Sequence, residues 1–278
     1  MIVVTGATGN VGRTLVRLLA EAGEQVTAVS RRITDADVPQ GVRAVAADLA
    51  DPVGMSAALE GADAVFLLTG GDLFATEPKE IVAAVSGPGR IVLLSSQGVV
   101  TRPDSASHGR FGAEVERAVI DSGARWTILR PGGFASNRYA WAGSIRADRT
   151  VAAPFGDVGL PIIDPDDIAA VAAAVLREPG HDGRTYELTG PEPVTPRQNA
   201  EAIGQAIGEP IAFVEQTREE ARAQMLAFMP APVADTTLDI LGEPTEAERR
   251  VSPDVERVLG RAPQPFAAWA RRNAAAFR

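Results

Sequence analysis

The sequence predicts an α/β protein with a doubly wound parallel sheet and a smaller mixed α/β region at its C-terminal end. In the first half, short apolar runs alternate with segments of helical periodicity. Strands and helices that alternate at these lengths indicate parallel pairing through right-handed crossovers. After about residue 155 the pattern becomes mixed and rich in proline. We therefore expect a large domain over residues 1–155 and a smaller, partly interleaved region over residues 156–278.

Strands and helices of the first half follow from apolar spacing and from glycine or proline stops. The opening apolar run is short, β-branched and followed by glycine, which is typical of a buried strand. The next segment has Val11, Leu15, Leu18 and Leu19 at helical spacing and stops at Gly23. The predicted strands are residues 2–5, 25–29, 42–46, 64–68, 90–94 and 126–129, and the predicted helices are 11–22, 52–59, 77–85 and 113–122.

The second half contains fewer strands and begins with a helix signal. Pro165 is followed by Asp166 and Asp167, and acidic residues in a first turn favour a helix. We predict helices over residues 168–176, 196–207, 218–228 and 265–275, with strands over residues 185–189 and 211–215. We expect this region to lie on the substrate side of the protein and not to fold as an independent unit.

Composition narrows the class of function. The 278 residues carry a net charge of −9, with 36 acidic and 27 basic side chains, so nucleic acid is not an expected partner. The chain has no cysteine, which excludes disulfides, iron–sulfur clusters and a thiol nucleophile. No histidine–carboxylate grouping has the spacing of a metal site, so no metal is expected. No secretory leader or membrane-spanning apolar run is visible, and we expect a cytoplasmic protein that does not bind membranes.

A glycine-rich loop connects the first predicted strand to the first helix. Gly6 permits the tight turn, Gly9 allows the backbone to approach a diphosphate, and Gly12 allows the helix to pack closely on the strand. The free N–H groups at the start of the helix then point at the phosphates. A glycine triplet alone is also consistent with an ordinary turn. Its position between strand and helix favours an NAD(P)-binding Rossmann domain over residues 1–155.

The end of the second strand distinguishes NAD from NADP. NAD sites place an acid there to bind the ribose 2′-hydroxyl. This chain has Arg31 and Arg32, which suit the 2′-phosphate of NADP(H). A pair of solvated surface arginines is the alternative, and Asp35 and Asp37 lie close enough to weaken the preference.

Several segments resemble the NmrA-like branch of the atypical short-chain dehydrogenases/reductases. The loop over residues 5–12 is similar to the superfamily's glycine loop, and residues 122–134 with Asn137 resemble the NmrA-like branch more specifically. The segment over residues 188–192 is similar to that branch as well. The resemblance extends from residue 1 to about residue 215 and does not include the last sixty or so residues.

The glycine loop, Arg31–Arg32 and the resemblance together predict which residues contact the cofactor. Asp48 and Leu49 resemble the pair that contacts adenine, and the segment over residues 131–134 is expected beside the nicotinamide. A proline–glycine turn with a core phenylalanine is the alternative interpretation of that segment. The predicted cofactor contacts are Gly6, Thr8, Gly9, Asn10, Val11, Gly12, Arg31, Arg32, Asp48, Leu49, Leu68, Thr69, Gly70, Ser95, Pro131, Gly132 and Phe134.

The catalytic residues usual in the superfamily are missing from this chain. Ordinary members use a tyrosine and a lysine four residues apart, and here the only lysine is Lys79, with neither tyrosine four residues before it. His108 occupies roughly the tyrosine position and Gly112 the lysine position. Histidine titrates near neutrality and can protonate a developing oxyanion, so His108 is the predicted acid. An exposed histidine at a helix start, without chemistry, is the alternative.

Two polar residues at the end of the fifth strand are further candidates. Ser96 is predicted to hydrogen-bond a substrate carbonyl, although it also simply closes the strand. Gln97 is a polar candidate in the same loop. His181 lies in a predicted glycine-rich turn and is expected to be structural.

The sequence supports an NADPH-dependent reductase of a small quinone, enone or carbonyl compound, as a monomer or homodimer. Such acceptors need less proton assistance than a plain ketone. A sensor that binds NADP(H) without chemistry and controls a partner protein is the main alternative, because related NmrA-like proteins include such sensors. An isomerase or epimerase is a third possibility, disfavoured because such enzymes usually keep the tyrosine.

Overall fold

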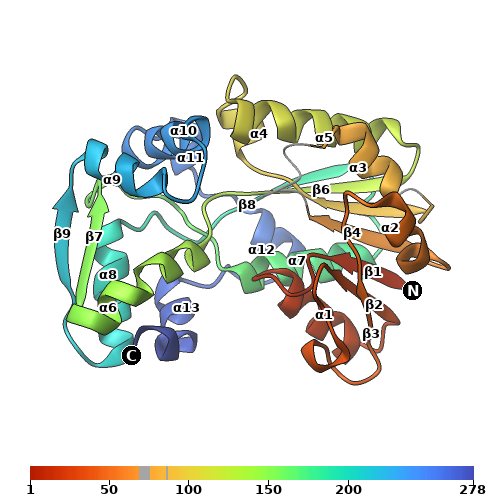
Figure 1. Ribbon diagram of the computed structural model, residues 1–278, viewed down its shortest axis with the longest axis horizontal. Helices are drawn as coiled ribbons and strands as arrows, with labels where there is room; N and C mark the ends of the chain where they lie inside the picture. The colour runs from red at the N-terminus through yellow and green to blue at the C-terminus, as the bar shows by residue number, and fades with distance from the viewer. Residues whose placement is uncertain (69–75, 86) are drawn as a thin grey trace.

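The computed structural model describes residues 1–68, 76–85 and 87–278. Two lobes lie side by side in Figure 1, with the N-terminal half of the chain in the right-hand lobe. The larger lobe contains a seven-stranded sheet and the smaller lobe a two-stranded sheet. The predicted α/β class with a doubly wound parallel sheet and a smaller mixed region is confirmed.

The large sheet has the strand order β3–β2–β1–β4–β5–β6–β8, and each neighbouring pair is parallel. Its strands are β1 (Ile2–Thr5), β2 (Val26–Ser30), β3 (Arg43–Ala46), β4 (Ala64–Leu68), β5 (Arg90–Leu94), β6 (Arg125–Pro131) and β8 (Arg184–Leu188). The order reverses between β1 and β4. In such sheets ligands bind outside the carboxyl ends of the strands at this reversal, which defines the edge to inspect for a site.

Helices cover both faces of the large sheet because successive side chains of its strands point to opposite sides. Val4 joins a buried cluster with Leu15 of α1, whereas the adjacent Val3 joins another with Met55 of α2. One face carries α1 (Gly12–Glu21), α7 (Pro165–Arg177) and α12 (Asp254–Leu259), and the other carries α2 (Pro52–Leu59), α3 (Pro78–Ala84) and α5 (Phe111–Asp121).

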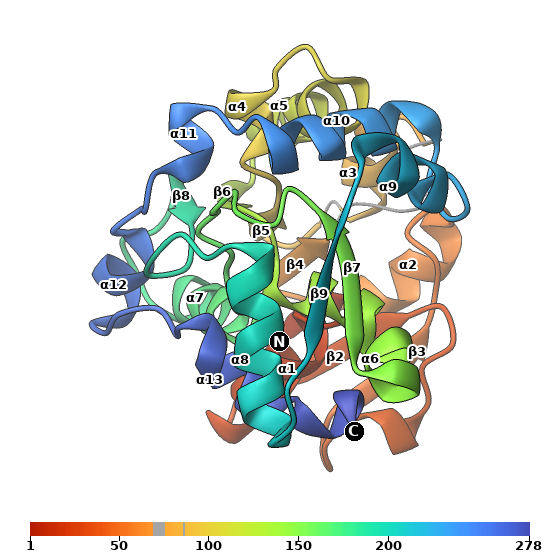
Figure 2. The same ribbon diagram turned by 90° about the vertical axis from the view of Figure 1, so that its left-hand side faces the viewer.

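The smaller lobe is built on β7 (Thr150–Pro154) and β9 (Ala212–Gln216), which pair in parallel and lie side by side in Figure 2. Its helices are α6 (Ala142–Asp148), α8 (Pro196–Ile207) and α13 (Phe266–Arg272). A separate apolar cluster joins them and includes Ile145, Ile203 and Trp269. This lobe therefore has its own core.

The chain after β9 passes between the lobes more than once. It forms α9 (Arg218–Met225), α10 (Ala231–Gly242) and α11 (Glu246–Arg249) above the smaller lobe in Figure 1. It then returns to the larger lobe, where α12 contacts α7 and β8, before α13 packs on α8. Shorter segments are η1 (Asp35–Asp37), α4 (Gly98–Thr101), η3 (Ala106–Arg110), η4 (Ala135–Trp141) and η5 (Ala274–Phe277).

Strand β7 and the helices α6, α10, α11 and α12 are the main elements that sequence periodicity did not indicate. The β7 segment is short, contains two alanines and ends in proline, so its apolar pattern is weak. It becomes a strand by pairing with β9, about sixty residues away in the chain. The predicted helix over residues 265–275 is divided between α13 and η5.

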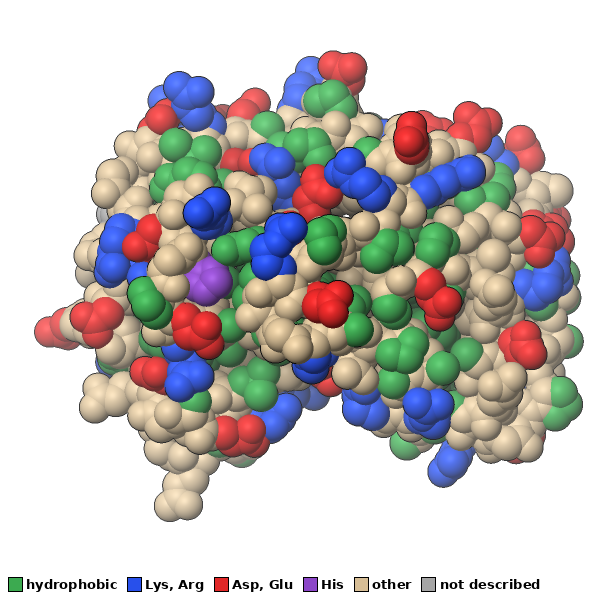
Figure 3. All heavy atoms as spheres, turned by 180° about the vertical axis from the view of Figure 1, so that it is seen from behind, with side chains coloured by type: hydrophobic (Ala, Val, Ile, Leu, Met, Phe, Trp, Pro, Cys, Tyr) green, Lys and Arg blue, Asp and Glu red, His purple; other side chains and the backbone are tan. Residues whose placement is uncertain are grey.

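The surface carries acidic and basic side chains interspersed over both lobes, as Figure 3 shows for one side of the molecule. Within the described ranges, no helix has both the length and the apolar character needed to cross a bilayer.

Candidate functional site

The glycine loop between β1 and α1 forms a turn that only glycine can fill at two positions. Gly6 has a φ of +63°, a conformation that glycine tolerates best. A Cβ on Gly12 would lie 2.2 Å from the carbonyl oxygen of Gly6. Helix α1 begins at Gly12 without a side-chain cap or an acidic residue in its first turn. This uncapped start beside a bare backbone turn fits the diphosphate of a dinucleotide.

Two threonines hold the glycine turn against neighbouring strands. The Thr5 hydroxyl donates to the carbonyl of Phe66 and accepts from the backbone N–H of Leu68, both at 2.9 Å. The hydroxyls of Thr8 and Ser30 lie 2.9 Å apart. The turn is thereby fixed to the ends of both β4 and β2. Thr5 was not among the predicted site residues, although its position at the strand end was a usable signal.

The residues predicted at the adenosine end lie at the carboxyl edge of the sheet. Arg31 and Arg32 are exposed directly after β2, and Asp48 is exposed after β3. Leu49 is half-buried, as is Leu68, whose side chain lies close to Gly6. Thr69 and Gly70 lie outside the described residues.

The loop after β6 is fastened between two other strands of the sheet. The backbone N–H of Gln97, beyond β5, donates to the carbonyl of Pro131 at 3.0 Å. Gly132 donates to the carbonyl of Leu188 at the end of β8, also at 3.0 Å. Phe134 is half-buried and packs against the cluster that contains α1 and α7. The predicted nicotinamide segment therefore lies beside the end of β5, with its backbone held from both sides.

A buried ion pair that sequence reasoning missed lies beneath this loop. Glu116 of α5 is almost fully buried and accepts two hydrogen bonds from Arg130 of β6, at 2.9 and 2.6 Å. The Ser95 hydroxyl also donates to Glu116, at 2.5 Å. The side chain of Ser95 therefore contributes to joining β5, β6 and α5.

Gly112, predicted at roughly the lysine position of ordinary family members, is crowded by one neighbouring side chain. A Cβ on Gly112 would lie 2.8 Å from the Val99 side chain and 3.9 Å from the Ser95 hydroxyl. The packing of α5 against Val99 of α4 therefore disfavours a side chain at this position.

His108 lies in the π-helical turn η3, next to the end of β5. A Cβ on Gly98 would lie 2.5 Å from the carbonyl oxygen of His108, so the two backbones are in contact. The ring nitrogen Nδ1 is 2.8 Å from the Ser107 hydroxyl. Burial lowers the pKa of His108 below its usual 6.5, which nearby Glu248 partly opposes. The Ser96 hydroxyl accepts from the Gly98 N–H at 3.1 Å.

The C-terminal segment covers the region around His108. Arg102, directly after α4, makes two hydrogen bonds to the carboxylate of Glu248 in α11, at 2.9 and 2.8 Å. Gln97 donates to the carbonyl of Ala247 at 3.1 Å. Part of the chain outside the predicted resemblance therefore forms a wall of the candidate site.

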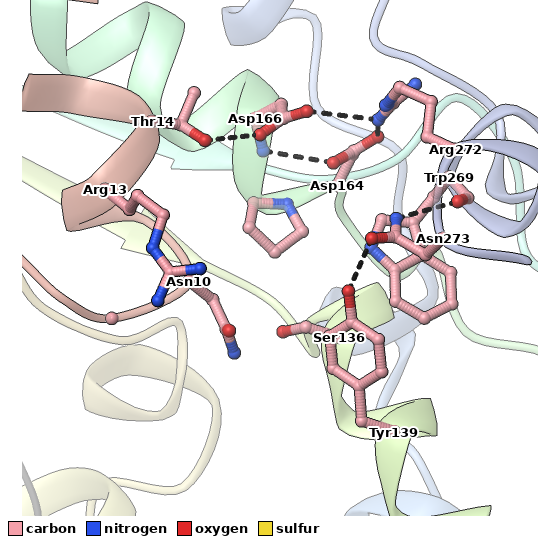
Figure 4. A pocket seen from close by; sticks show the side chains of 12 residues that line it. Asn10, Arg13, Thr14, Ser136, Tyr139, Asp164, Asp166, Trp269, Arg272 and Asn273 are labelled. Atoms are coloured by element: carbon pink, nitrogen blue, oxygen red, sulfur yellow. Dashed lines mark hydrogen bonds and ion pairs between the residues drawn. The ribbon is translucent and has the colours of Figure 1, made fainter. Parts of the chain in front are cut away.

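A cavity of about 250 Å³ lies between the lobes, beside the first turn of α1 (Figure 4). Asn10 and Arg13 lie on one side, and Ser136 and Tyr139 lie opposite. His108 and Ser96 do not line it. Only Gly9 and Asn10 were predicted site residues; Arg13 and Thr14 follow the glycine loop directly, whereas the rest come from segments distant in the chain. The lining residues are Gly9, Asn10, Arg13, Thr14, Ser136, Tyr139, Asp164, Pro165, Asp166, Trp269, Arg272 and Asn273.

The fold and the glycine turn define a Rossmann-type dinucleotide-binding protein, and comparison with known proteins identifies the family. The model of a family described as NAD(P)H-binding matches residues 6–179. The chain belongs to this NAD(P)H-binding family. The prediction that the chain binds a nicotinamide dinucleotide is confirmed.

Two reductases resemble the chain over its whole length. The (4-alkanoyl-5-oxo-2,5-dihydrofuran-3-yl)methyl phosphate reductase of Streptomyces griseus is 39% identical, covering 100% of this chain and 99% of its own length. The NAD(P)H azoreductase of Xenophilus azovorans is 35% identical, with the same coverage. The chain is therefore an NAD(P)H-dependent oxidoreductase, as predicted.

Solved structures agree with this fold. The Escherichia coli NADPH-dependent quinone oxidoreductase in complex with NADPH superposes with a TM-score of 0.79 at 24% identity, over 98% of this chain and 99% of that one. The negative transcriptional regulator NmrA superposes with a TM-score of 0.72 at 18% identity, over 97% and 94% of the two chains. The chain therefore shares the fold of these proteins, which include NmrA itself.

Among the described residues, the structure contains no group of three or more histidine or carboxylate side chains that could hold a metal ion.

Proposed function

We propose that this protein uses NADPH to reduce the electron-poor double bond of a small quinone or α,β-unsaturated carbonyl compound. The two full-length relatives support this class. The name of the first describes an alkene conjugated with two carbonyl groups, and the name of the second an azo group. Both are conjugated acceptors that take up a hydride readily.

The packing of Gly112 is the observation that carries the proposal. Without the lysine, a tyrosine at the usual position would keep a high pKa, and this chain has no tyrosine there. Strong general acid catalysis of the kind a plain ketone requires is therefore missing. A quinone or an enone delocalises the incoming charge and is reducible with a weaker proton donor.

His108 and Ser96 have complementary roles in this proposal. The bound nicotinamide supplies the hydride. Nδ1 of His108 faces Ser107, so Nε2 is the nitrogen assigned to deliver a proton to the substrate oxygen. The Ser96 oxygen already accepts from Gly98, which leaves the hydroxyl proton to donate to that same oxygen. The segment after β6 and the α10–α11 wall limit access of water to these groups.

The cofactor contacts remain those predicted from the sequence. Gly6, Gly9 and Gly12 cradle the diphosphate, Arg31 and Arg32 select NADP(H), and the segment from Pro131 to Phe134 lies beside the nicotinamide. Both arginines are exposed at the end of β2, where the 2′-phosphate of an incoming NADP(H) can reach them, and this exposure supports their role.

The cofactor preference has a direct test. Arg32→Asp introduces the acid that NAD sites carry and is expected to weaken NADPH binding about tenfold relative to NADH. Fluorescence titration with both cofactors measures the ratio. An unchanged ratio would remove Arg32 from the 2′-phosphate site.

The reaction is tested with a panel of quinones, enones and plain ketones, following the loss of NADPH absorbance. We expect turnover of quinones and enones and little of ketones. His108→Ala is expected to reduce turnover at least tenfold, whereas His181→Ala, at the opposite end of the sheet, is the matched control. Tight NADPH binding without turnover of any acceptor would favour the sensor function and contradict the proposal.

A further inference from the structure

Arg138 is a cation of the smaller lobe without an anion beside it. It lies in η4, directly after the segment predicted to pass the nicotinamide. Burial alone lowers the pKa of its guanidinium to about 10, and no carboxylate among the described residues opposes that shift. A charge that is removed from water without a counter-charge costs free energy. An anion bound at Arg138 would recover part of that cost.

Two uncharged side chains fix the orientation of this guanidinium. Its central carbon lies 4.8 Å from the centre of the Trp141 ring, so the ring covers one of its faces. Asn199 of α8 is fully buried, and with its amide oxygen toward Arg138 it accepts from Nε at 3.0 Å and from Nη2 at 3.1 Å. The guanidinium is therefore held in place while its charge stays uncompensated.

The contact with Asn199 uses only one edge of the guanidinium. An arginine has five N–H groups in a fixed plane, and Nε and Nη2 form the edge that faces Asn199. The outer edge keeps one N–H of Nη1 and one of Nη2, which are parallel to each other. The Arg138 side chain is partly exposed, so a ligand can reach it. Two parallel N–H groups match two oxygens of a carboxylate or a phosphate.

Helix α8 adds a positive potential at the same place. Asn199 lies near the start of this twelve-residue helix, whose first turn contains no acidic side chain. The N-terminal end of a helix carries a partial positive charge, which disfavours a neighbouring cation and favours an anion. An oxyanion bound to Arg138 would therefore be stabilised by the guanidinium and by the helix.

Arg138 lies apart from the cavity beside the glycine turn. Ser136 and Tyr139 point from η4 into that cavity in Figure 4, whereas Arg138 does not line it. Arg138 contacts Trp141 and α8 of the smaller lobe instead. The cation thus belongs to the part of the molecule that is expected to bind the substrate.

We propose that Arg138 binds an oxyanion substituent, a carboxylate or a phosphate, on the acceptor that the enzyme reduces. This inference rests on the proposed function, because it adds an anionic substituent to the same class of conjugated acceptor. The anion occupies the outer edge of Arg138, and the double bond extends toward the segment after β6. Substrate selection then depends on the smaller lobe, and hydride transfer on the larger one.

Calorimetric titration of the full-length protein, saturated with NADP⁺, tests the proposal without turnover. Saturation fills the phosphate sites of the cofactor itself. The ligands are 2-naphthoate, 2-naphthyl phosphate and the uncharged 2-naphthamide, which share one ring system. The variants are Arg138→Met and Arg138→Lys. The matched control is Arg146→Met in α6, an exposed arginine of the same lobe that donates to the carbonyl of Ala276.

We expect the wild type and Arg146→Met to bind at least one of the two anions about tenfold more tightly than 2-naphthamide. The anion that binds more tightly distinguishes a carboxylate from a phosphate substituent. Arg138→Met should lose the preference for anions and bind 2-naphthamide like the wild type. Arg138→Lys keeps the charge and a donor for Asn199 but not the parallel edge, so its preference should fall about threefold. This variant provides the same test if Arg138→Met does not fold.

Equal wild-type affinity for all three ligands, or an anion preference that survives in both variants, would overturn the proposal. Equal weakening of all three ligands in Arg138→Met, with a lower thermal midpoint, would overturn it as well, because Arg138 would then only support the fold. None of these results depends on reduction. Failure to reduce any quinone or enone would contradict the proposed function and leave the anion site intact.

Discussion

The two lobes contribute to the candidate site in different ways. The larger lobe contributes the backbone turn over residues 5–12, and side chains that follow that turn or the strand ends closely in the chain, such as Arg13 and Arg31. The smaller lobe and the C-terminal segment contribute side chains, such as Ser136, Asn273 and Glu248, from segments far apart in the chain. Backbone geometry that depends on a few adjacent glycines is visible in a sequence. A cluster assembled by tertiary packing becomes visible only in the structure.

The substitution Gly12→Ala tests whether the glycine turn of the larger lobe determines cofactor affinity, and it has the largest expected effect. The added Cβ would collide with the carbonyl of Gly6, and rigid backbone on both sides leaves little room to relax. We expect NADPH affinity to fall at least about a hundredfold, measured by fluorescence titration. Gly143→Ala in α6 is the control, since nothing lies within 4 Å of its added Cβ. Near-normal affinity of Gly12→Ala would show that the turn is not the decisive feature.

Prediction from sequence succeeded where the signals were local. The strands of the large sheet and the glycine loop were found because β-branched runs and glycine stops repeat at short spacing. The Glu116–Arg130 pair and the covering of His108 were not found. Nothing in the sequence near Glu116 distinguishes it from a solvated helix residue, and only the packing of α5 on β6 buries it.

Glu116→Gln tests the buried Glu116–Arg130 ion pair of the larger lobe. It removes the negative charge that pairs with Arg130 and Ser95, and leaves a largely buried arginine without an anion. The free energy of unfolding should fall by about 3 kcal/mol, measured by urea denaturation. Glu21→Gln, in an exposed pair with Arg17, should cost less than about 0.5 kcal/mol. Equal costs for the two variants would contradict the structural role of Glu116.

Glu248→Gln examines the attachment of the C-terminal segment. The buried Glu248 carboxylate binds Arg102, so its loss should free residues 231–249 locally and leave the two cores intact. We expect amide hydrogen exchange in this segment to accelerate about tenfold to thirtyfold, corresponding to about 1.5–2 kcal/mol. The exposed Glu246→Gln should exchange like the wild type. A uniform acceleration across both lobes would mean that the segment is not separately attached.

The pH dependence of His108 provides the smallest expected effect. Burial lowers the pKa of His108, so the ring is mostly neutral at neutral pH. If its protonated form donates the proton, turnover should rise several-fold as the pH falls from about 7.5 toward 6. His108→Ala should flatten this rise, measured under saturating NADPH. A rise that persists in His108→Ala would assign it to another group.

The same shift has a consequence for stability. Folding favours the neutral ring of His108, so the unfolded chain binds a proton more readily than the folded one. The free energy of unfolding should therefore decrease as the pH falls through about 6.5, the ordinary pKa of histidine. Comparing wild type with His108→Ala in urea at several pH values isolates this contribution.

The return of α12 to the larger lobe affects the order in which the two lobes can fold during synthesis. Val255 belongs to the same buried cluster as β1 and α1, at the far end of the chain. Strand β8 likewise closes the edge of the sheet after β7 has entered the other lobe. During synthesis, which proceeds from the N-terminus, the core around the glycine turn lacks these pieces until residue 255 has left the ribosome. The nucleotide-binding half thus completes its fold almost last, although it is translated first.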